Sequence, residues 1–114
     1  MVVERSTIAR DIDCIGIDTW GVDYGLLDKN GKLLGNPYHY RDTRTDGMYD
    51  KVFPIVPKEE VFKKTGIAFN WFNTLYQMTA AKLSDDTALK EAKTMLMIPD
   101  LFNFFLTGVK KMEY

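Results

Sequence analysis

The residues with the greatest capacity for chemistry lie in two short polar stretches. The first follows an apolar run and places Asp18, Trp20, Gly21 and Asp23 within six positions. Carboxylates accept hydrogen bonds from hydroxyl groups, and an exposed indole can serve as a platform for a sugar ring. The second stretch, residues 40–45, adds further charged side chains. Together they predict a polar pocket at the end of a strand.

The charged side chains of these stretches also have ordinary structural explanations. A carboxylate at a strand end often caps a turn, and for Asp18, Asp23 or Asp42 that explanation carries the same weight as a functional one. Arg41 and Arg44 can form surface ion pairs worth about 0–1 kcal/mol. The functional alternative is that Arg44 pairs with a buried aspartate and fixes the wall of the pocket.

An aromatic stretch lies further along the chain. Residues 67–72 are too apolar for a solvated loop and are expected to line a pocket or to fill the floor of a cleft. Asn73 and Thr74 come directly after them. These two residues are either a helix cap or a pair that binds hydroxyl groups.

Several kinds of catalytic site have no support in the sequence. It contains no glycine-rich phosphate loop, and its one cysteine and one histidine cannot build a metal centre of such ligands. His39 is expected to pack or to lie at the surface rather than to act as a base. Cys14 is expected to be a small buried hydrophobic residue. No serine is accompanied by the His and Asp residues that form the catalytic triad of a serine hydrolase.

Composition is that of an ordinary globular protein. The chain has 114 residues, of which 46% are hydrophobic, and this suits one domain or a piece of one. A net charge of −1 gives no electrostatic reason to expect nucleic acid or a membrane as partner. No apolar run approaches the roughly 18 residues that span a bilayer. The low cysteine content fits a reducing compartment, and a cytoplasmic location is expected.

The pattern of secondary structure begins with strands. Residues 13–18, 22–28 and 33–40 are expected to form an antiparallel meander, because short loops join them. The Asn-Gly pair at 30–31 supplies the positive φ that a tight hairpin turn needs. Pro37 should end the third strand or hold it at the edge of the sheet.

Helical patterns follow the strands and complete an α/β class. Asp46 is expected to cap the first helix, and the inward face of the third should carry Leu75, Met78, Ala80 and Ala81. The predicted helices span residues 46–56, 58–64, 73–83 and 99–106, with a short strand at 94–98. Three or four strands would leave an exposed edge and one bare face, so part of the domain is expected to be missing.

Longer motifs resemble those of the FGGY family of carbohydrate kinases. The two longest are Ile15-Gly-Ile-Asp-Thr-Trp-Gly-Val-Asp-Tyr-Gly-Leu-Leu-Asp28 and Tyr40-Arg-Asp-Thr-Arg-Thr-Asp-Gly47. Shorter matches, in the family's order, are Thr65-Gly-Ile, Phe72-Asn-Thr-Leu-Tyr-Gln77, Met97-Ile-Pro-Asp100 and Leu106-Thr-Gly108. The matches cover most of residues 12–114, and the two longest are most similar to the branch of the family whose substrate is L-rhamnulose.

The resemblance implies part of a ribonuclease-H-like (actin-like ATPase) domain. Residues 1–114 would be a partial N-terminal sugar kinase domain, with the phosphate-binding hairpin before it and the catalytic base after it. The complete enzyme would use ATP and Mg²⁺ to phosphorylate the 1-hydroxyl of L-rhamnulose in rhamnose catabolism. The expected partners are the sugar and the remainder of the kinase chain, and the piece alone is expected to be inactive.

The resemblance also points to sugar-binding positions and to no catalytic residue or metal ligand. The substrate-binding residues would be Trp20, Gly21, Asp23, Asp42 and Asn73. Other branches of the family carry polar or charged side chains at the position of Gly21, so contact here would run through its main chain. Two alternatives stay open. One is another ketose or polyol kinase of this family, and the other is a non-catalytic ribonuclease-H-like module that binds a sugar or a partner protein.

Overall fold

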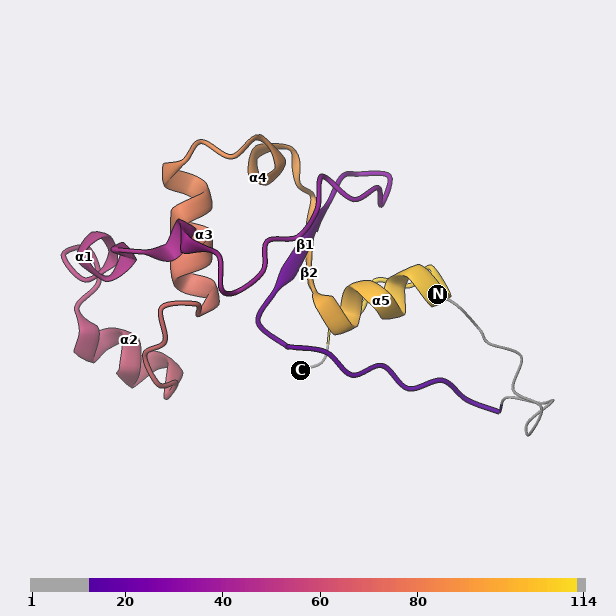
Figure 1. Cartoon of the computed structure of the whole chain (residues 1–114), viewed down its shortest axis with the longest axis horizontal. Coiled ribbons are helices and arrows are strands. Elements are labelled where there is room, and N and C mark those ends of the chain that lie inside the picture. Colours follow the sequence, from indigo (N-terminus) through magenta and orange to yellow (C-terminus); the bar gives the residue numbers. More distant parts are fainter. Residues whose placement is uncertain (1–12, 113–114) are drawn as a thin grey trace.

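The computed structural model describes residues 13–112, which form a mixed α/β arrangement (Figure 1). The strands are β1 (Tyr24–Leu27) and β2 (Thr94–Met97), and a short 3₁₀ helix, η1, spans Thr43–Thr45. The α-helices are α1 (Met48–Val52), α2 (Lys58–Thr65), α3 (Thr74–Leu83), α4 (Thr87–Glu91) and α5 (Ile98–Thr107). The expected α/β class is therefore confirmed at this level of detail.

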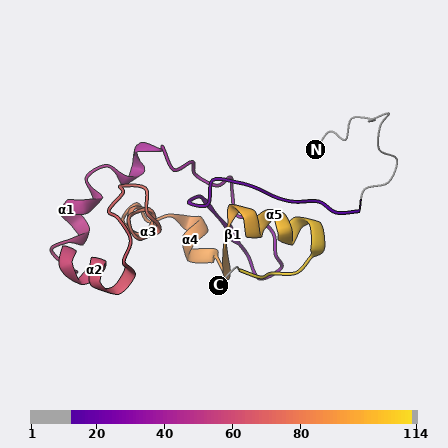
Figure 2. The same ribbon diagram turned by 90° about the horizontal axis from the view of Figure 1, so that it is seen from below.

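The described residues contain one small sheet, built from β1 and β2. The two strands are antiparallel, with Tyr24 opposite Met97 and Leu27 opposite Thr94. All residues of β1 are buried, which explains its apolar sequence. Helix α5 follows β2 directly and packs back on the pair (Figure 2). The sheet and α5 thus form one packing unit.

The expected three-stranded meander is wrong. Residues 13–19 are not part of any strand in the described range, and β1 pairs with β2 instead. A strand has two edges, and the second edge of β1 is used by the bridge from Leu27 to Leu33. The rest of the expected return strand does not form, because Gly35 turns the chain with a φ of 80° and Pro37 has no N–H to donate.

The missing first strand changes the surroundings of Cys14. We expected a buried residue, but the thiol is exposed. The side chain has no sheet to pack against, because its segment has no strand partner among the described residues. Ile15 beside it is also 65% exposed.

Helix ends largely follow the expected signals. Gly66 and Gly108 end α2 and α5 in the left-handed conformation, with φ of 64° and 72°. Pro99 lies in the first turn of α5. Proline lacks a backbone N–H, but an N–H at this position would have no hydrogen-bond partner within the helix. The predicted helices at 58–64, 73–83 and 99–106 are confirmed with small changes in their bounds.

The first predicted helix is shorter than expected and begins later. Asp46 is the C-cap of η1 and not the N-cap of α1. Gly47 interrupts the helical path with a φ of 71°, so α1 begins at Met48 and covers five residues. Sequence periodicity alone did not reveal the separate 3₁₀ turn at residues 43–45.

Two apolar groups hold these elements together. Leu27, Leu96 and Leu101 form the first, between the sheet and α5. Gly25 permits this approach, since a Cβ there would lie 2.7 Å from Leu101 Cδ2. The second group lies between α1 and α3, where the ring of Tyr76 meets that of Tyr49 edge-on at 4.7 Å.

The inward face of α3 differs from the expected one. Its buried residues are Tyr76, Gln77, Ala80 and Ala81, whereas Leu75 is 41% exposed. The two alanines were predicted correctly. The helix is rotated relative to the expectation because Tyr76 is the larger anchor, and this rotation brings Gln77 inside.

Candidate functional site

The turn formed by residues 18–23 lies at the surface of the protein. Trp20 is 70% exposed, and no heavy atom lies within 4 Å of a Cβ built on Gly21. The main chain of Asp23 accepts a hydrogen bond of 3.0 Å from the N–H of Ile98, which ties the turn to the start of α5. One carboxylate oxygen of Asp23 is buried and has no hydrogen-bond partner among the described residues. The indole of Trp20 and the main chain of Gly21 are therefore accessible from solvent, and the main-chain hydrogen bond between Asp23 and Ile98 holds the turn in place.

Aromatic rings connect this turn with the other two stretches. The ring centroids of Trp20 and Tyr40 are 6.0 Å apart, and those of Tyr40 and Phe72 are 5.4 Å apart in an edge-on arrangement. Trp71 meets Phe72 at 5.3 Å. The structure thus brings together three segments that the sequence analysis had singled out separately.

Asp42 has the capping role that was one of its two interpretations. Its carboxylate accepts a hydrogen bond of 2.8 Å from the N–H of Arg44 and so begins η1. Asp42 is partly buried, whereas Asp18 is exposed. The geometry shows a structural contribution of Asp42 to the loop at residues 40–45.

Arg44 has a different partner from the ones expected. Its Nη2 donates to the side-chain oxygen of Gln77 at 2.8 Å, and no carboxylate pairs with its guanidinium among the described residues. The guanidinium carbon lies 4.0 Å from the ring centroid of Tyr38. A stacked and hydrogen-bonded arginine of this kind fixes the position of its loop.

Gln77 is the residue of this region that the sequence analysis missed. Its Nε2 donates to two main-chain oxygens, that of Val22 at 2.9 Å and that of Phe72 at 2.7 Å. The side chain is 2% exposed. The residue before it, Tyr76, has a phenol whose pKa is raised, mainly by burial and secondly by the charge interaction with Tyr49. No local sequence signal marks this position, because the partners of Gln77 lie up to 55 residues away along the chain.

Asn73 lies directly before α3 but does not cap it with its side chain. Its Nδ2 donates to the main-chain oxygen of Ala68 at 2.8 Å, which closes the loop at residues 68–73. Asn73 also lines a pocket of about 350 Å³ together with Val22. The other lining residues are Val61, Thr65, Ile67, Phe69, Thr74, Leu75 and Tyr76.

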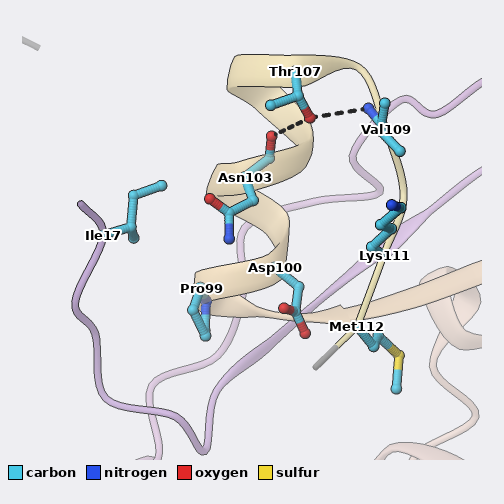
Figure 3. A pocket seen from close by; sticks show the side chains of 8 residues that line it. All are labelled: Ile17, Pro99, Asp100, Asn103, Thr107, Val109, Lys111 and Met112. Atoms are coloured by element: carbon cyan, nitrogen blue, oxygen red, sulfur yellow. Dashed lines mark hydrogen bonds between the residues drawn. The ribbon is translucent and has the colours of Figure 1, made fainter. Parts of the chain in front are cut away.

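A larger hollow lies elsewhere, between α5 and the segments on either side of it (Figure 3). It measures about 660 Å³, and none of the predicted site residues lines it. The hydroxyl of Thr107 donates to the Asn103 main chain at 2.7 Å and accepts from the N–H of Val109 at 3.1 Å. The Thr107 hydroxyl thus serves the end of α5. Because none of the predicted site residues lines this hollow, we place the candidate site at the turn and not here.

Within residues 13–112 no group of three or more His, Cys, Asp or Glu side chains is placed to hold a metal. The sequence also lacks a glycine-rich phosphate loop.

Similarity to known proteins identifies the family. Residues 2–114 match the N-terminal domain of the FGGY family of carbohydrate kinases. The chain belongs to this family. Its described part contains no helix that is long and apolar enough to cross a membrane.

Several curated proteins similar to this chain are named rhamnulokinase. The protein from Mannheimia succiniciproducens is 50% identical over 109 residues, which cover 96% of this chain and 23% of that protein. Those from Oceanobacillus iheyensis and Pectobacterium atrosepticum are 50% and 49% identical over 88% and 90% of the chain. The chain spans less than a quarter of the length of these relatives.

Proposed function

We propose that this chain is the sugar-binding part of the N-terminal domain of a rhamnulokinase. The complete enzyme transfers the γ-phosphoryl group of ATP to the 1-hydroxyl of L-rhamnulose. The identity of about half of all aligned positions to rhamnulokinases supports this proposal. The observation that carries it is the connection between the open turn at residues 20–22 and the segment at residues 72–73. The ring of Tyr40 and the amide of Gln77 make this connection.

The proposed residues have different tasks at the sugar. Trp20 offers its exposed ring to the apolar face of the sugar, and Gly21 offers main-chain groups that no side chain covers. Asn73 faces the sugar from the other side of the site. Asp42 acts through the main chain that it caps at η1. Asp23 lies beside Val22, and its carboxylate has a buried oxygen that no group of the described residues satisfies.

The nucleotide and its metal ion belong to other parts of the enzyme in this proposal. ATP and a divalent ion, Mg²⁺ in the expected case, supply the phosphoryl group and its charge stabilisation. The phosphate-binding hairpin would precede this segment, and the catalytic base would follow it. The segment would then be part of a ribonuclease-H-like domain, with the remainder of the kinase chain as its partner.

A substrate panel tests the proposed specificity. The protein to use is this chain joined at both ends to the flanking sequence of the Mannheimia succiniciproducens relative, called here the extended protein. We expect kcat/KM to be highest for L-rhamnulose, because Gly21 provides no side chain to hold a more polar substrate. A higher kcat/KM for glycerol or D-xylulose would move the proposal to another kinase of the family.

A further inference from the structure

We infer that Gln77 is a positioning residue for the sugar, because one buried amide fixes the distance between the two sides of the binding site. This inference rests on the proposed function. Gln77 belongs to α3, whose residues lie beside η1 (Figure 1). It touches none of the reacting atoms, and it acts through the segments that it holds.

The three hydrogen bonds of Gln77 match the chemistry of a primary amide. Its oxygen can only accept, and Arg44 donates to it from Nη2 at 2.8 Å. Its nitrogen donates twice, to the main-chain oxygens of Val22 and Phe72 at 2.9 and 2.7 Å. A guanidinium can only donate and a carbonyl can only accept, so the orientation of the amide is determined by its partners.

Each partner lies next to a residue of the proposed sugar site. Val22 follows Gly21, and Phe72 precedes Asn73. Arg44 is held at its N–H by the Asp42 carboxylate. One side chain thus connects the turn at residues 19–22, the segment at 72–73 and the loop at 40–45.

Burial makes this connection stiff. Gln77 is 2% exposed, so water does not readily replace an amide hydrogen that is lost. A buried carbonyl oxygen without a hydrogen-bond partner costs free energy, so the turn would shift until water reaches this oxygen. The consequence is a change in the spacing between Gly21 and Asn73, to which sugar binding is sensitive.

Gln77→Glu in the extended protein is the main test. The carboxylate keeps an acceptor for Arg44, but its second oxygen has no N–H and faces the carbonyl oxygens of Val22 and Phe72, so both main-chain bonds are removed. We expect the KM for L-rhamnulose to rise about tenfold. The KM for ATP should stay unchanged and kcat should change less than the sugar KM, because the nucleotide and the base lie on other segments.

Leu96→Ala is the matched control for lost stability. Leu96 is also 2% exposed, but it packs in the sheet core against Leu27 and Leu101. This variant should lower the melting temperature and leave the KM for L-rhamnulose unchanged. Gln77→Asn retains the amide on a side chain one methylene shorter, and it should raise the sugar KM less than Gln77→Glu.

The outcomes separate this inference from the proposed function. An unchanged sugar KM in both Gln77 variants, or equal increases for sugar and ATP, overturns the positioning role and leaves the proposed function in place. Failure of both variants to fold also overturns it and assigns Gln77 to stability alone. An unsubstituted extended protein without activity on L-rhamnulose overturns the proposed function and this inference together.

Discussion

Gly21 is the residue at which a ligand contact can be separated from a folding effect. No described heavy atom lies within 4 Å of a Cβ built at this position, so the side chain introduced by Gly21→Val removes no packing contact and extends into open space. If the sugar lies against its main chain, we expect the KM for L-rhamnulose to rise about tenfold. Gly21→Ala should give a smaller increase, and the melting temperature of both variants should stay close to that of the unsubstituted protein.

Kinetics of the extended protein check this prediction. A fall in melting temperature without a change in KM would mean that Gly21 serves the turn and not the sugar. Unchanged values of both would remove Gly21 from the proposed site.

Arg44 is expected to be a structural residue. Arg44→Met keeps much of the apolar stem but removes the hydrogen bond to Gln77 and the charge over Tyr38. We expect the free energy of unfolding to fall by about 1–3 kcal/mol, because a buried acceptor is left without its donor. Chemical denaturation of the extended protein measures this loss. A larger effect on sugar affinity than on stability would instead make Arg44 a ligand of the sugar.

At the residue scale, the sequence indicated the turn but not what holds it. Trp20, Gly21 and Asp23 could be identified because polar and aromatic residues interrupt an apolar run. Gln77 could not, since a glutamine in a helix is ordinarily a surface residue and its partners lie far away in the sequence. Long-range hydrogen bonds of this kind leave no local pattern.

The turn after β1 gives a prediction about pH at the scale of an element. The N–H groups of Lys32 and Asn30 donate to the Asp28 carboxylate, and the bond from Lys32 is the main cause that lowers the pKa of Asp28 below 3.8. The charged form is therefore favoured in the folded state. Its stabilising effect is fully present above pH 3.8 and is lost as the pH falls through the lower folded pKa.

Asp28→Asn tests this effect, because it removes the charge and retains a similar shape. The denaturant concentrations at which the unsubstituted protein and the Asp28→Asn variant are half unfolded should differ most near neutral pH. The difference should shrink as the pH falls below 3.8, since protonated Asp28 then resembles asparagine. A difference that stays constant over this range would show that the charge of Asp28 does not matter to the turn.

Elements with local signals were predicted well, and strand pairing was not. The ends of α2 and α5 follow from glycine and proline at their boundaries. The partner of β1 did not follow, because pairing with β2 depends on which segments fold back and not on the residues of β1 itself. Short loops favoured a meander, but residues 13–19 form no strand in the described range, and Gly35 and Pro37 end the return strand after the bridge at Leu33.

At the scale of the molecule, the described residues expose an apolar patch on α5. Phe102, Phe105 and Leu106 are about half exposed on one face of α5, and they line a hollow of about 590 Å³ with residues 15–19. Exposed apolar patches of this kind are typical of a surface that another part covers. In the proposed enzyme, the remainder of the kinase chain would cover it.

A hydrophobic fluorescent dye measures this exposure. We expect the chain alone to bind the dye, and the extended protein to bind much less per molecule. Phe105→Glu should reduce dye binding by the chain, because it places a charge in the patch on α5. Ile55→Glu adds the same charge at a separate exposed position and serves as the control. A chain that stays monomeric and binds no dye would contradict this account of the α5 face.

The central claim is that this chain is the sugar-binding part of a rhamnulokinase. The most direct test is ATP-dependent phosphorylation of L-rhamnulose, measured side by side with this chain and with the extended protein. The account predicts that only the extended protein forms the 1-phosphate. Activity of this chain alone would show that it holds catalytic parts assigned here to other segments, and no activity in either protein would contradict the proposed substrate.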